Sequence, residues 1–254
     1  MIDIHSHLIP AFDDGSRSVE QSGTVLRMFE QHGVQHVVLT PHVLASELAT
    51  STEEMVRRRD AAFAPLERLA VVTPRLHLGF EIMLDQPMAA DVIGDRRVSL
   101  AGSRYYLVEF PYTVAPQFAQ AVLSDLVRAR TVPIVAHPER YEACSPRAVA
   151  AWRDAGARIQ LDATTLTRVT DRGHRARELL ASGLADVIAA DNHGNQRSVK
   201  TGVEYLEKRG AGAQAELLAV ANPRAVLEDQ PMTAVPPVSL KEGLVNRWKR
   251  FLTG

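Results

Sequence analysis

Two histidines near the start of the chain are the first residues whose type and spacing could do chemistry. His5 and His7 lie two positions apart, in a segment where isoleucines alternate with polar side chains. In an extended strand with a two-residue period, both imidazoles lie on one face and can bind one cation together. Asp14 follows in a turn before a predicted helix, and its carboxylate can return to the same place. An isolated His-x-His pair is about as often a polar strand edge, so the interpretation depends on partners elsewhere in the chain.

Further titratable residues stand at the carboxyl ends of predicted strands. They are His42, Glu81, Glu109, His137, Asp191 and His193. A single His or Glu at a strand end is more often a residue that hydrogen-bonds a loop. Six such positions at strand ends are unlike a chance pattern. The carboxyl ends of parallel strands meet on one rim, where active sites are built. We therefore expect these side chains to gather with His5, His7 and Asp14.

The nine residues form a ligand set of five imidazoles and four carboxylates without a thiolate. Such a set suits manganese, iron or zinc and disfavours a thiolate-type structural zinc site. Nine ligands exceed what one ion can use, so we expect two to three divalent ions, with Glu81 as a bridging carboxylate. Clustered cations lower the pKa of a bridging water and bind an anionic substrate, which is typical of phosphoester hydrolysis. The other four histidines are expected at helix ends or sheet surfaces; they are His32, His36, His77 and His174.

The elements that must position these residues alternate regularly along the chain. Strands are predicted at residues 2–7, 36–40, 76–80, 105–110, 133–137, 158–162 and 186–190. Helices are predicted near residues 17–32, 52–71, 115–130, 146–156, 172–182 and 197–209. This alternation predicts an α/β fold with a parallel sheet, either open or closed into a barrel.

Composition narrows the class of protein. At 254 residues and 46% hydrophobic, the chain can build a core of enzyme size. Its 29 Lys and Arg against 30 Asp and Glu argue against nucleic-acid binding and bulk membrane binding. Cys144 is the only cysteine, which excludes a disulfide framework, and its setting predicts a structural role. Without a signal peptide or a long apolar run, we expect a cytoplasmic protein.

The end of the chain differs from the rest. Residues 1–229 contain no linker, residues 230–238 read as a stiff Pro-rich connector, and residues 239–254 form the last segment. An amphipathic helix is predicted at residues 239–252, with Leu240, Leu244, Trp248, Phe251 and Leu252 on one side. Two interpretations stay open: packing on its own barrel or across a dimer, and docking on a membrane surface or a partner protein. The oligomeric state is also open.

The ordered motifs resemble a known family. The set His5-x-His7, Thr-Pro-His42, Glu109-Phe-Pro, His137-Pro-Glu-Arg-Tyr and Asp191-x-His193 resembles the polymerase and histidinol phosphatase (PHP) superfamily. Within it, the first seven residues and Ala-His-Pro-Glu-Arg-Tyr are most similar to bacterial metal-dependent protein-tyrosine phosphatases of capsule and exopolysaccharide gene clusters. The resemblance runs from residue 1 to about residue 229. It implies the PHP fold, a distorted TIM-like (β/α)7 barrel with a trinuclear site on its rim.

The resemblance also assigns roles to residues. It implies a first ion held by His5, His7, Glu81 and Asp191. It implies a second ion, bridged by Glu81 and held by Glu109 and His137, and a third held by Asp14, His42 and His193. It also implies three catalytic residues: His42 and two arginines, Arg140 and Arg197, that would contact the phosphate. Asp3 shares the strand face with His5 and is expected to orient an imidazole.

The implied activity is that of a manganese-dependent protein-tyrosine phosphatase, with iron or zinc as alternatives. Its substrate would be the phosphotyrosyl tail of a membrane-associated tyrosine autokinase that regulates capsular or exopolysaccharide synthesis. In the expected mechanism a metal-bridging hydroxide attacks phosphorus, the ions and Arg140 hold the non-bridging oxygens, and tyrosinate leaves. Two alternatives remain open: a histidinol-phosphate or other small-molecule phosphoesterase on the same fold, and a non-catalytic metal-binding module. A nuclease is disfavoured because the rim offers few lysines.

Overall fold

Parallel β-sheets form the centre of the molecule in a computed structural model that describes residues 1–69 and 74–239. A six-stranded sheet has the order β3-β5-β6-β7-β8-β9, and a three-stranded sheet has the order β1-β2-β4. The strands are β1 (Ile2–Ser6), β2 (His36–Leu39), β3 (His42–Leu44), β4 (Arg75–Leu78), β5 (Glu81–Met83), β6 (Tyr105–Glu109), β7 (Val132–Ala136), β8 (Arg158–Asp162) and β9 (Val187–Ala189). All seven predicted strand segments are confirmed, and the paired strands run parallel, as the alternation predicted.

Two short strands, β3 and β5, are absent from the sequence prediction. Each follows a longer strand after a two-residue interruption, at Thr40–Pro41 and at Gly79–Phe80. Proline has no N–H to donate to a ladder, so Pro41 ends β2 and lets the chain bend into the second sheet. On the other side, hydrogen bonds join β1 to the segment after β9: the Asp191 amide donates to the His5 carbonyl at 3.0 Å. The fold is therefore mixed α/β with two parallel sheets. The chain passes from one sheet to the other between β2 and β3 and again between β4 and β5.

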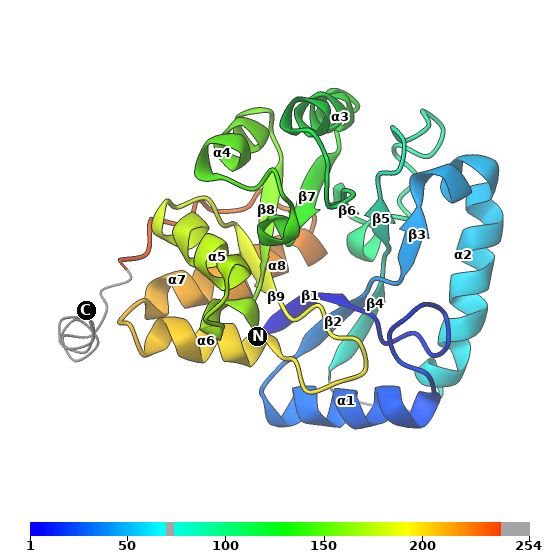
Figure 1. The fold of residues 1–254 in the computed structure, drawn as a ribbon. Helices are drawn as coiled ribbons and strands as arrows, with labels where there is room; N and C mark the ends of the chain where they lie inside the picture. The colour runs from blue at the N-terminus through cyan, green and yellow to red at the C-terminus, as the bar shows by residue number, and fades with distance from the viewer. Residues whose placement is uncertain (70–73, 240–254) are drawn as a thin grey trace.

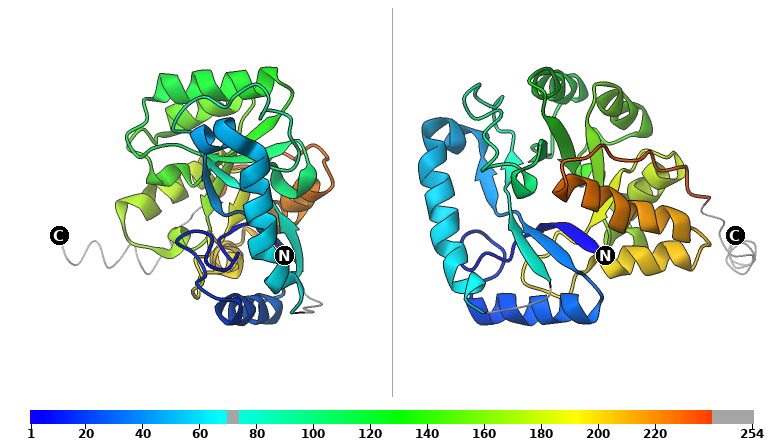
Figure 2. Two further views of the ribbon diagram at one scale, coloured as in Figure 1. Left: turned by 90° about the vertical axis from the view of Figure 1, so that its right-hand side faces the viewer. Right: turned by 180° about the vertical axis from the view of Figure 1, so that it is seen from behind.

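Helices cover the outer faces of these sheets (Figures 1 and 2). They are α1 (Val19–Gln31), α2 (Ala45–Glu67), α3 (Pro116–Arg128), α4 (Pro146–Asp154), α5 (Asp171–Ala181), α6 (Val199–Glu207), α7 (Gly212–Glu216) and α8 (Asn222–Leu227). The first six confirm the predicted helices, and α7 and α8 were not predicted. α2 begins at Ala45, earlier than the predicted start near residue 52. Ser51 is non-helical, with φ −163°, and its Oγ accepts from the Glu54 amide, but a further helical segment precedes it.

The apolar core has two parts. The larger part fills the space between helices and sheets, where Trp152 and Phe29 are fully buried. The smaller part gathers alternate residues of neighbouring strands, such as Leu107 of β6 and Ile134 of β7, as the two-residue period of a strand requires. In the described part of the chain, no helix has the length and apolar character needed to cross a membrane.

The segment at residues 230–238 lies against the molecule. Val235 and Val238 are buried, and the Val238 amide donates to the Leu180 carbonyl at 3.0 Å. The predicted helix at residues 239–252 lies outside the described residues, apart from Ser239. The predicted domain boundaries stay a prediction.

Candidate metal centre

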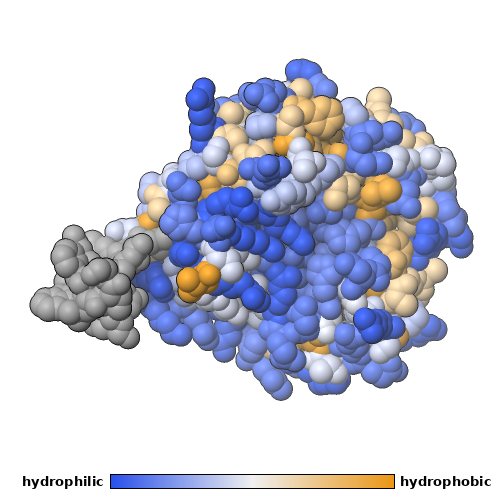
Figure 3. Space-filling view, in the orientation of Figure 1, coloured by the Kyte–Doolittle hydropathy of each residue, from blue (hydrophilic) through white to orange (hydrophobic). Residues whose placement is uncertain are grey.

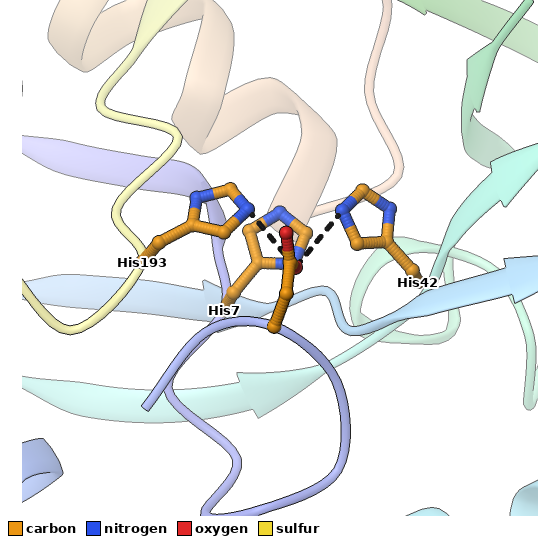
Figure 4. Close-up of side chains that lie close together, drawn as sticks. His7, His42 and His193 are labelled. Carbon is orange, nitrogen blue, oxygen red and sulfur yellow. Dashed lines mark ion pairs between the residues drawn. The ribbon is translucent and has the colours of Figure 1, made fainter. Parts of the chain in front are cut away.

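All nine predicted ligands lie together in the structure. They fall into four overlapping groups, and within each group one ligand atom per residue lies within 4.8 Å of the others. The groups are His7, Asp14, His42 and His193; His5, His7 and Glu81; His5, His137 and Asp191; and His42, Glu81 and Glu109. Figure 4 shows His7, His42 and His193 pointing toward one another from separate segments of the chain. Their role as ligands stays a prediction, but no member of the set lies elsewhere.

Two of the nine residues stand at strand positions that differ from the prediction. His42 and Glu81 were expected to end the second and third strands. In the structure they begin β3 and β5 instead, and they are register partners in that sheet. Both still reach the same place, because each lies where the chain bends from one sheet into the other.

Glu81 lies at the centre of the cluster and is fully buried. Its carboxylate oxygens lie 2.8–3.3 Å from nitrogens of four imidazoles, those of His5, His7, His42 and His137. Burial opposes ionisation, but the charge of His5 and the hydrogen bond from His137 hold the pKa of Glu81 well below its usual range. Glu81 is thus a carboxylate kept ionised by surrounding positive charge.

The imidazoles respond to the same carboxylates. Burial disfavours the imidazolium, yet the charge of Glu81 raises the pKa of His5, and a hydrogen bond to Asp13 raises the pKa of His7 well above its ordinary value. His42 is also partly buried, and its hydrogen bonds to Glu109 and Glu81 raise its pKa to about 10. The buried carboxylates therefore favour positive charge on these three imidazoles.

The donor atoms fit divalent cations. Two buried carboxylate oxygens, Glu81 Oε2 and Asp191 Oδ1, lie 3.0–3.5 Å from the Nε2 atoms of His5 and His7, and within the described residues none of these contacts has the geometry of a hydrogen bond. His5 Nδ1 lies 2.9 Å from the Gln160 side-chain oxygen, and His7 Nδ1 lies 2.8 Å from Asp13 Oδ2. Since those oxygens accept, each Nδ1 carries a proton, and in the neutral ring the Nε2 lone pair then faces the cluster. Carboxylate oxygens and imidazole lone pairs that face one another are what a metal site needs.

Asp13 and Gln160 are supporting residues that the sequence interpretation missed. Asp13 also accepts from the backbone amides of His42 and Gly15, both at 3.0 Å. Its place beside Asp14 in the Asp-Asp-Gly turn was a usable signal. Gln160 lies in β8, 155 residues from His5, and nothing local in the sequence connects the two.

The predicted role of Asp3 is wrong. Its carboxylate accepts from the backbone amides of His5 and Ala190, at 3.2 Å each, and not from an imidazole. Asp3 is fully buried, and burial raises its pKa to about 7. It therefore ties β1 to the end of β9, while Gln160 orients the His5 ring.

Backbone conformations at the site are unusual. His137 and Asp191 have positive φ values of 31° and 47°, a conformation that costs free energy for residues other than glycine. Gly15 allows its loop to pass directly over His7, because a Cβ there would lie 2.1 Å from the His7 carbonyl oxygen. Such local strain is a common feature of functional sites.

The two predicted arginines both lie beside the cluster, but their side chains differ in exposure and in the groups that they contact. The Arg140 side chain is 43% exposed, and its Nη1 lies 3.3 Å from His137 Nε2 and 3.7 Å from Asp191 Oδ2. The Arg197 side chain is 25% exposed, and its Nη1 lies 3.3 Å from Asp191 Oδ2. Arg140 is therefore the more accessible cation.

The remaining histidines and the cysteine lie apart from the cluster. His36 and His77 contact each other on β2 and β4, with Nδ1 and Nε2 3.0 Å apart, and His32 follows the end of α1. His174 lies in α5. Burial raises the pKa of Cys144 to about 12, which makes its thiolate scarce at neutral pH.

Comparison with known proteins supports one family. The profile described as "Capsular polysaccharide synthesis, CpsB/CapC" matches residues 1–228. The tyrosine-protein phosphatase YwqE of Bacillus subtilis is 27% identical over 249 residues, covering 95% of this chain and 97% of that protein. The tyrosine-protein phosphatase CpsB of Streptococcus pneumoniae is 27% identical over 246 residues, covering 91% and 99%.

Solved structures agree on the fold. A structure from the work describing YwqE and CpsB as "unique metal-dependent tyrosine phosphatases" has a TM-score of 0.77 at 24% identity and covers 95% of this chain and 100% of that one. Dihydropyrimidinase from Brevibacillus agri has a TM-score of 0.51 at 11% identity, covering 94% and 72%. Similarity at these identities concerns the fold alone.

Proposed function

The chain belongs to the CpsB/CapC family of capsular polysaccharide synthesis, and from this premise we propose that it is a metal-dependent protein-tyrosine phosphatase. The observation that carries the proposal is the convergence of nine His, Asp and Glu side chains around the buried Glu81. A non-catalytic module of the same fold would have lost some of these side chains, and none is missing. The relatives named above are called tyrosine-protein phosphatases, which favours the same activity.

The nine residues would hold two to three divalent ions, with manganese as the proposed metal. Mixed imidazole and carboxylate ligands suit manganese, iron and zinc, and the absence of thiolates disfavours a structural zinc site. When bound, such ions supply positive charge that lowers the pKa of water and stabilises negative charge on phosphoryl oxygens. Glu81 lies between the groups and is the proposed bridging ligand.

The residues of the chain prepare the site for this chemistry. Asp13 and Gln160 hold His7 and His5 with their Nε2 lone pairs directed inward. His42 has a 32% exposed side chain, so it borders both the buried cluster and the approaching substrate. Imidazoles fixed in this way bind cations without reorganising, which is how a preorganised site stabilises a transition state.

Arg140 is the proposed phosphate ligand. Its exposed guanidinium lies beside the cluster and can donate charge-assisted hydrogen bonds to two phosphate oxygens. Hydrophilic residues cover the middle of the face shown in Figure 3. A phenolate leaving group with a pKa of about 10 leaves without a strong general acid. Arg197 is the second proposed cation of the site.

Finer parts of the proposal follow from the family. The substrate is the phosphotyrosyl tail of a membrane-associated tyrosine kinase, since the family is one of capsular polysaccharide synthesis. The enzyme acts in the cytoplasm, where kinases find ATP. The two sheets form one distorted (β/α)7 barrel; the hydrogen bonds between β1 and the segment after β9 support this closure. Residues 1–229 form the catalytic unit, with residues 230–238 as connector and residues 239–254 as an added segment.

A substrate panel tests the proposal. Purified protein with manganese is assayed against a phosphotyrosyl peptide, the matching phosphoseryl peptide and histidinol phosphate. We expect kcat/KM to be highest for the phosphotyrosyl peptide. A preference for histidinol phosphate would replace the proposal with a small-molecule phosphoesterase, and no hydrolysis of any substrate would favour a binding module.

A further inference from the structure

Asp162 is a buried carboxylate that neither the sequence motifs nor the proposed ligand set uses. It ends β8, and β8 is the one predicted strand that supplied no candidate ligand. The side chain is fully buried. Six donors converge on its two oxygens: the amides and hydroxyls of Thr164 and Thr165, one Nη of Arg172 and one Nη of Arg197. A carboxylate that accepts so many hydrogen bonds has one fixed orientation.

All three guanidinium nitrogens of Arg197 have hydrogen-bond partners, and this fixed carboxylate is one of them. Arg197 Nη2 binds Asp162 Oδ2, Nε donates to Thr164 Oγ1 at 3.2 Å, and Nη1 donates to Asp191 Oδ2 at 3.3 Å. Thr164 Oγ1 in turn donates to Asp162 Oδ1 at 2.8 Å. The planar guanidinium is therefore clamped between the end of β8 and the end of β9.

The clamp reaches the cluster through Asp191. Arg197 occupies Asp191 Oδ2, while Asp191 Oδ1 has no hydrogen-bond partner in the part of the chain that the structure describes. That oxygen lies 3.5 Å from the Nε2 atoms of both His5 and His7. Asp191 also has a positive φ of 47°, so its backbone alone does not favour this position.

We propose that Asp162 is a positioning residue that acts through Arg197 to present Asp191 Oδ1 to the metal centre. The inference rests on the proposed function, because it takes Asp191 as a ligand. Of the two arginines, Arg140 stays exposed for the phosphate, whereas Arg197 is engaged with two carboxylates. Outer residues that orient a ligand typically change metal affinity or activity by about 10- to 100-fold when replaced.

Asp162→Asn is the informative substitution. It keeps the size of the side chain but removes the charge and turns one accepting oxygen into a donor that faces other donors. Arg197 then loses its main partner, and Asp191 loses its fixed orientation. Thr164→Val is a milder second variant, since it removes only the hydroxyl that bridges Asp162 and Arg197.

The chain offers a matched control at the opposite end of β8. Asp186 is buried, pairs with Arg153 at 2.9 and 3.2 Å, and accepts from the Ile159 amide at 2.9 Å. Asp186→Asn therefore breaks an Asp–Arg pair that contacts the start of β8 through the Ile159 amide, without touching the cluster. D186N should lose about as much stability as D162N, but its manganese affinity and kcat should stay unchanged.

The experiment measures manganese affinity by calorimetric titration, together with kcat and KM on a phosphotyrosyl peptide. We expect D162N to bind manganese at least 10-fold more weakly and to lose kcat, with T164V changed in the same direction and D186N unchanged in both. Arg197→Ala should show the same loss, and adding D162N to R197A should cost less than 2-fold more, since both act through one contact.

The outcomes separate the inference from the proposed function. The positioning role would be overturned if the losses of manganese affinity and kcat multiplied in the double variant. It would also be overturned if D162N and T164V had the manganese affinity and kcat of wild type or of D186N. If D162N does not fold, the manganese affinity and kcat of T164V and R197A test the positioning role instead. A wild-type protein that neither binds manganese nor hydrolyses the peptide would instead refute the proposed function itself.

Discussion

Asp13 offers a direct test of how the site is held in place, because one carboxylate supports two proposed ligands. Asp13 Oδ2 accepts from His7 Nδ1 at 2.8 Å and from the His42 amide at 3.0 Å. In Asp13→Asn, a side-chain N–H facing His7 Nδ1 favours the opposite tautomer, which moves the ring proton to Nε2 and into the cluster. Manganese affinity and kcat/KM should each fall about 10- to 100-fold, the usual cost of losing a partner that orients a ligand.

The same residue predicts an acid limit for the metal-free protein. Although burial opposes ionisation, the hydrogen bond from His7 lowers the pKa of Asp13 from 3.8 to about 2. A lowered pKa stabilises the fold above pH 3.8, and that stability is lost as the pH falls toward 2. The difference corresponds to about 2 kcal/mol in the free energy of unfolding. D13N should lack this part of the pH dependence.

The assays are a manganese titration, peptide hydrolysis at saturating manganese, and urea unfolding of the metal-free protein at pH 3 and pH 6. Asp60→Asn is the control, since Asp60 is 52% exposed and pairs with Arg59 on α2. It should change neither affinity nor activity. A folded D13N protein with wild-type manganese affinity and kcat/KM would show that Asp13 does not orient His7.

Three other predictions address separate parts of the account. Arg140→Ala should lower kcat/KM on phosphotyrosyl peptide by about 10² or more while the protein keeps its full metal content. This is the scale of losing one oriented charged donor. Steady-state kinetics together with metal analysis measure the effect. Cys144→Ser should keep full activity, and iodoacetamide should not inhibit below about pH 10, because the pKa of the thiol is about 12. Deleting residues 231–254 should lower the free energy of unfolding by about 3 kcal/mol or more, since Val235 and Val238 are buried and each such side chain contributes about 1.5–3 kcal/mol. Urea unfolding measures this, and a protein truncated after Ser239, which keeps both valines, is the control.

Contrary results would be informative in each case. Unchanged turnover in R140A would remove Arg140 from the phosphate site. Inhibition by alkylation that C144S abolishes would point to a thiol near the reaction. Equal stability of the two truncated proteins would mean that the packing of residues 231–238 contributes little to folding.

The strand pattern and the ligand set could be predicted because both are local features of the sequence. Short apolar runs between helical patterns mark the seven predicted strands, and the ligands stand at or beside the ends of those strands. β3 and β5 could not be predicted, since each begins two residues after a longer strand, beyond a bend at Pro41 or Gly79 that the tertiary fold imposes. In the sequence, a three-residue segment so close to a longer strand looks like its continuation.

The supporting residues escaped prediction for a different reason. Gln160 reaches His5 across 155 residues, and Asp162 reaches Arg197 across 35. Such pairs exist only once the strands are side by side. The role of Asp3 was misjudged because a shared strand face does not decide whether a carboxylate binds a side chain or a backbone amide. Its partners, the amides of His5 and Ala190, are backbone groups that no residue pattern reveals.

We propose that the nine-residue cluster around Glu81 is a metal centre that hydrolyses phosphotyrosine. The most direct measurement is the metal content per chain together with phosphotyrosyl peptide hydrolysis, before chelation, after chelation and after return of manganese. We predict two to three ions per chain, loss of hydrolysis when they are removed, and recovery on adding manganese, with Glu81→Gln binding fewer ions and failing to recover. Full hydrolysis by protein that retains well below one ion per chain would contradict the account.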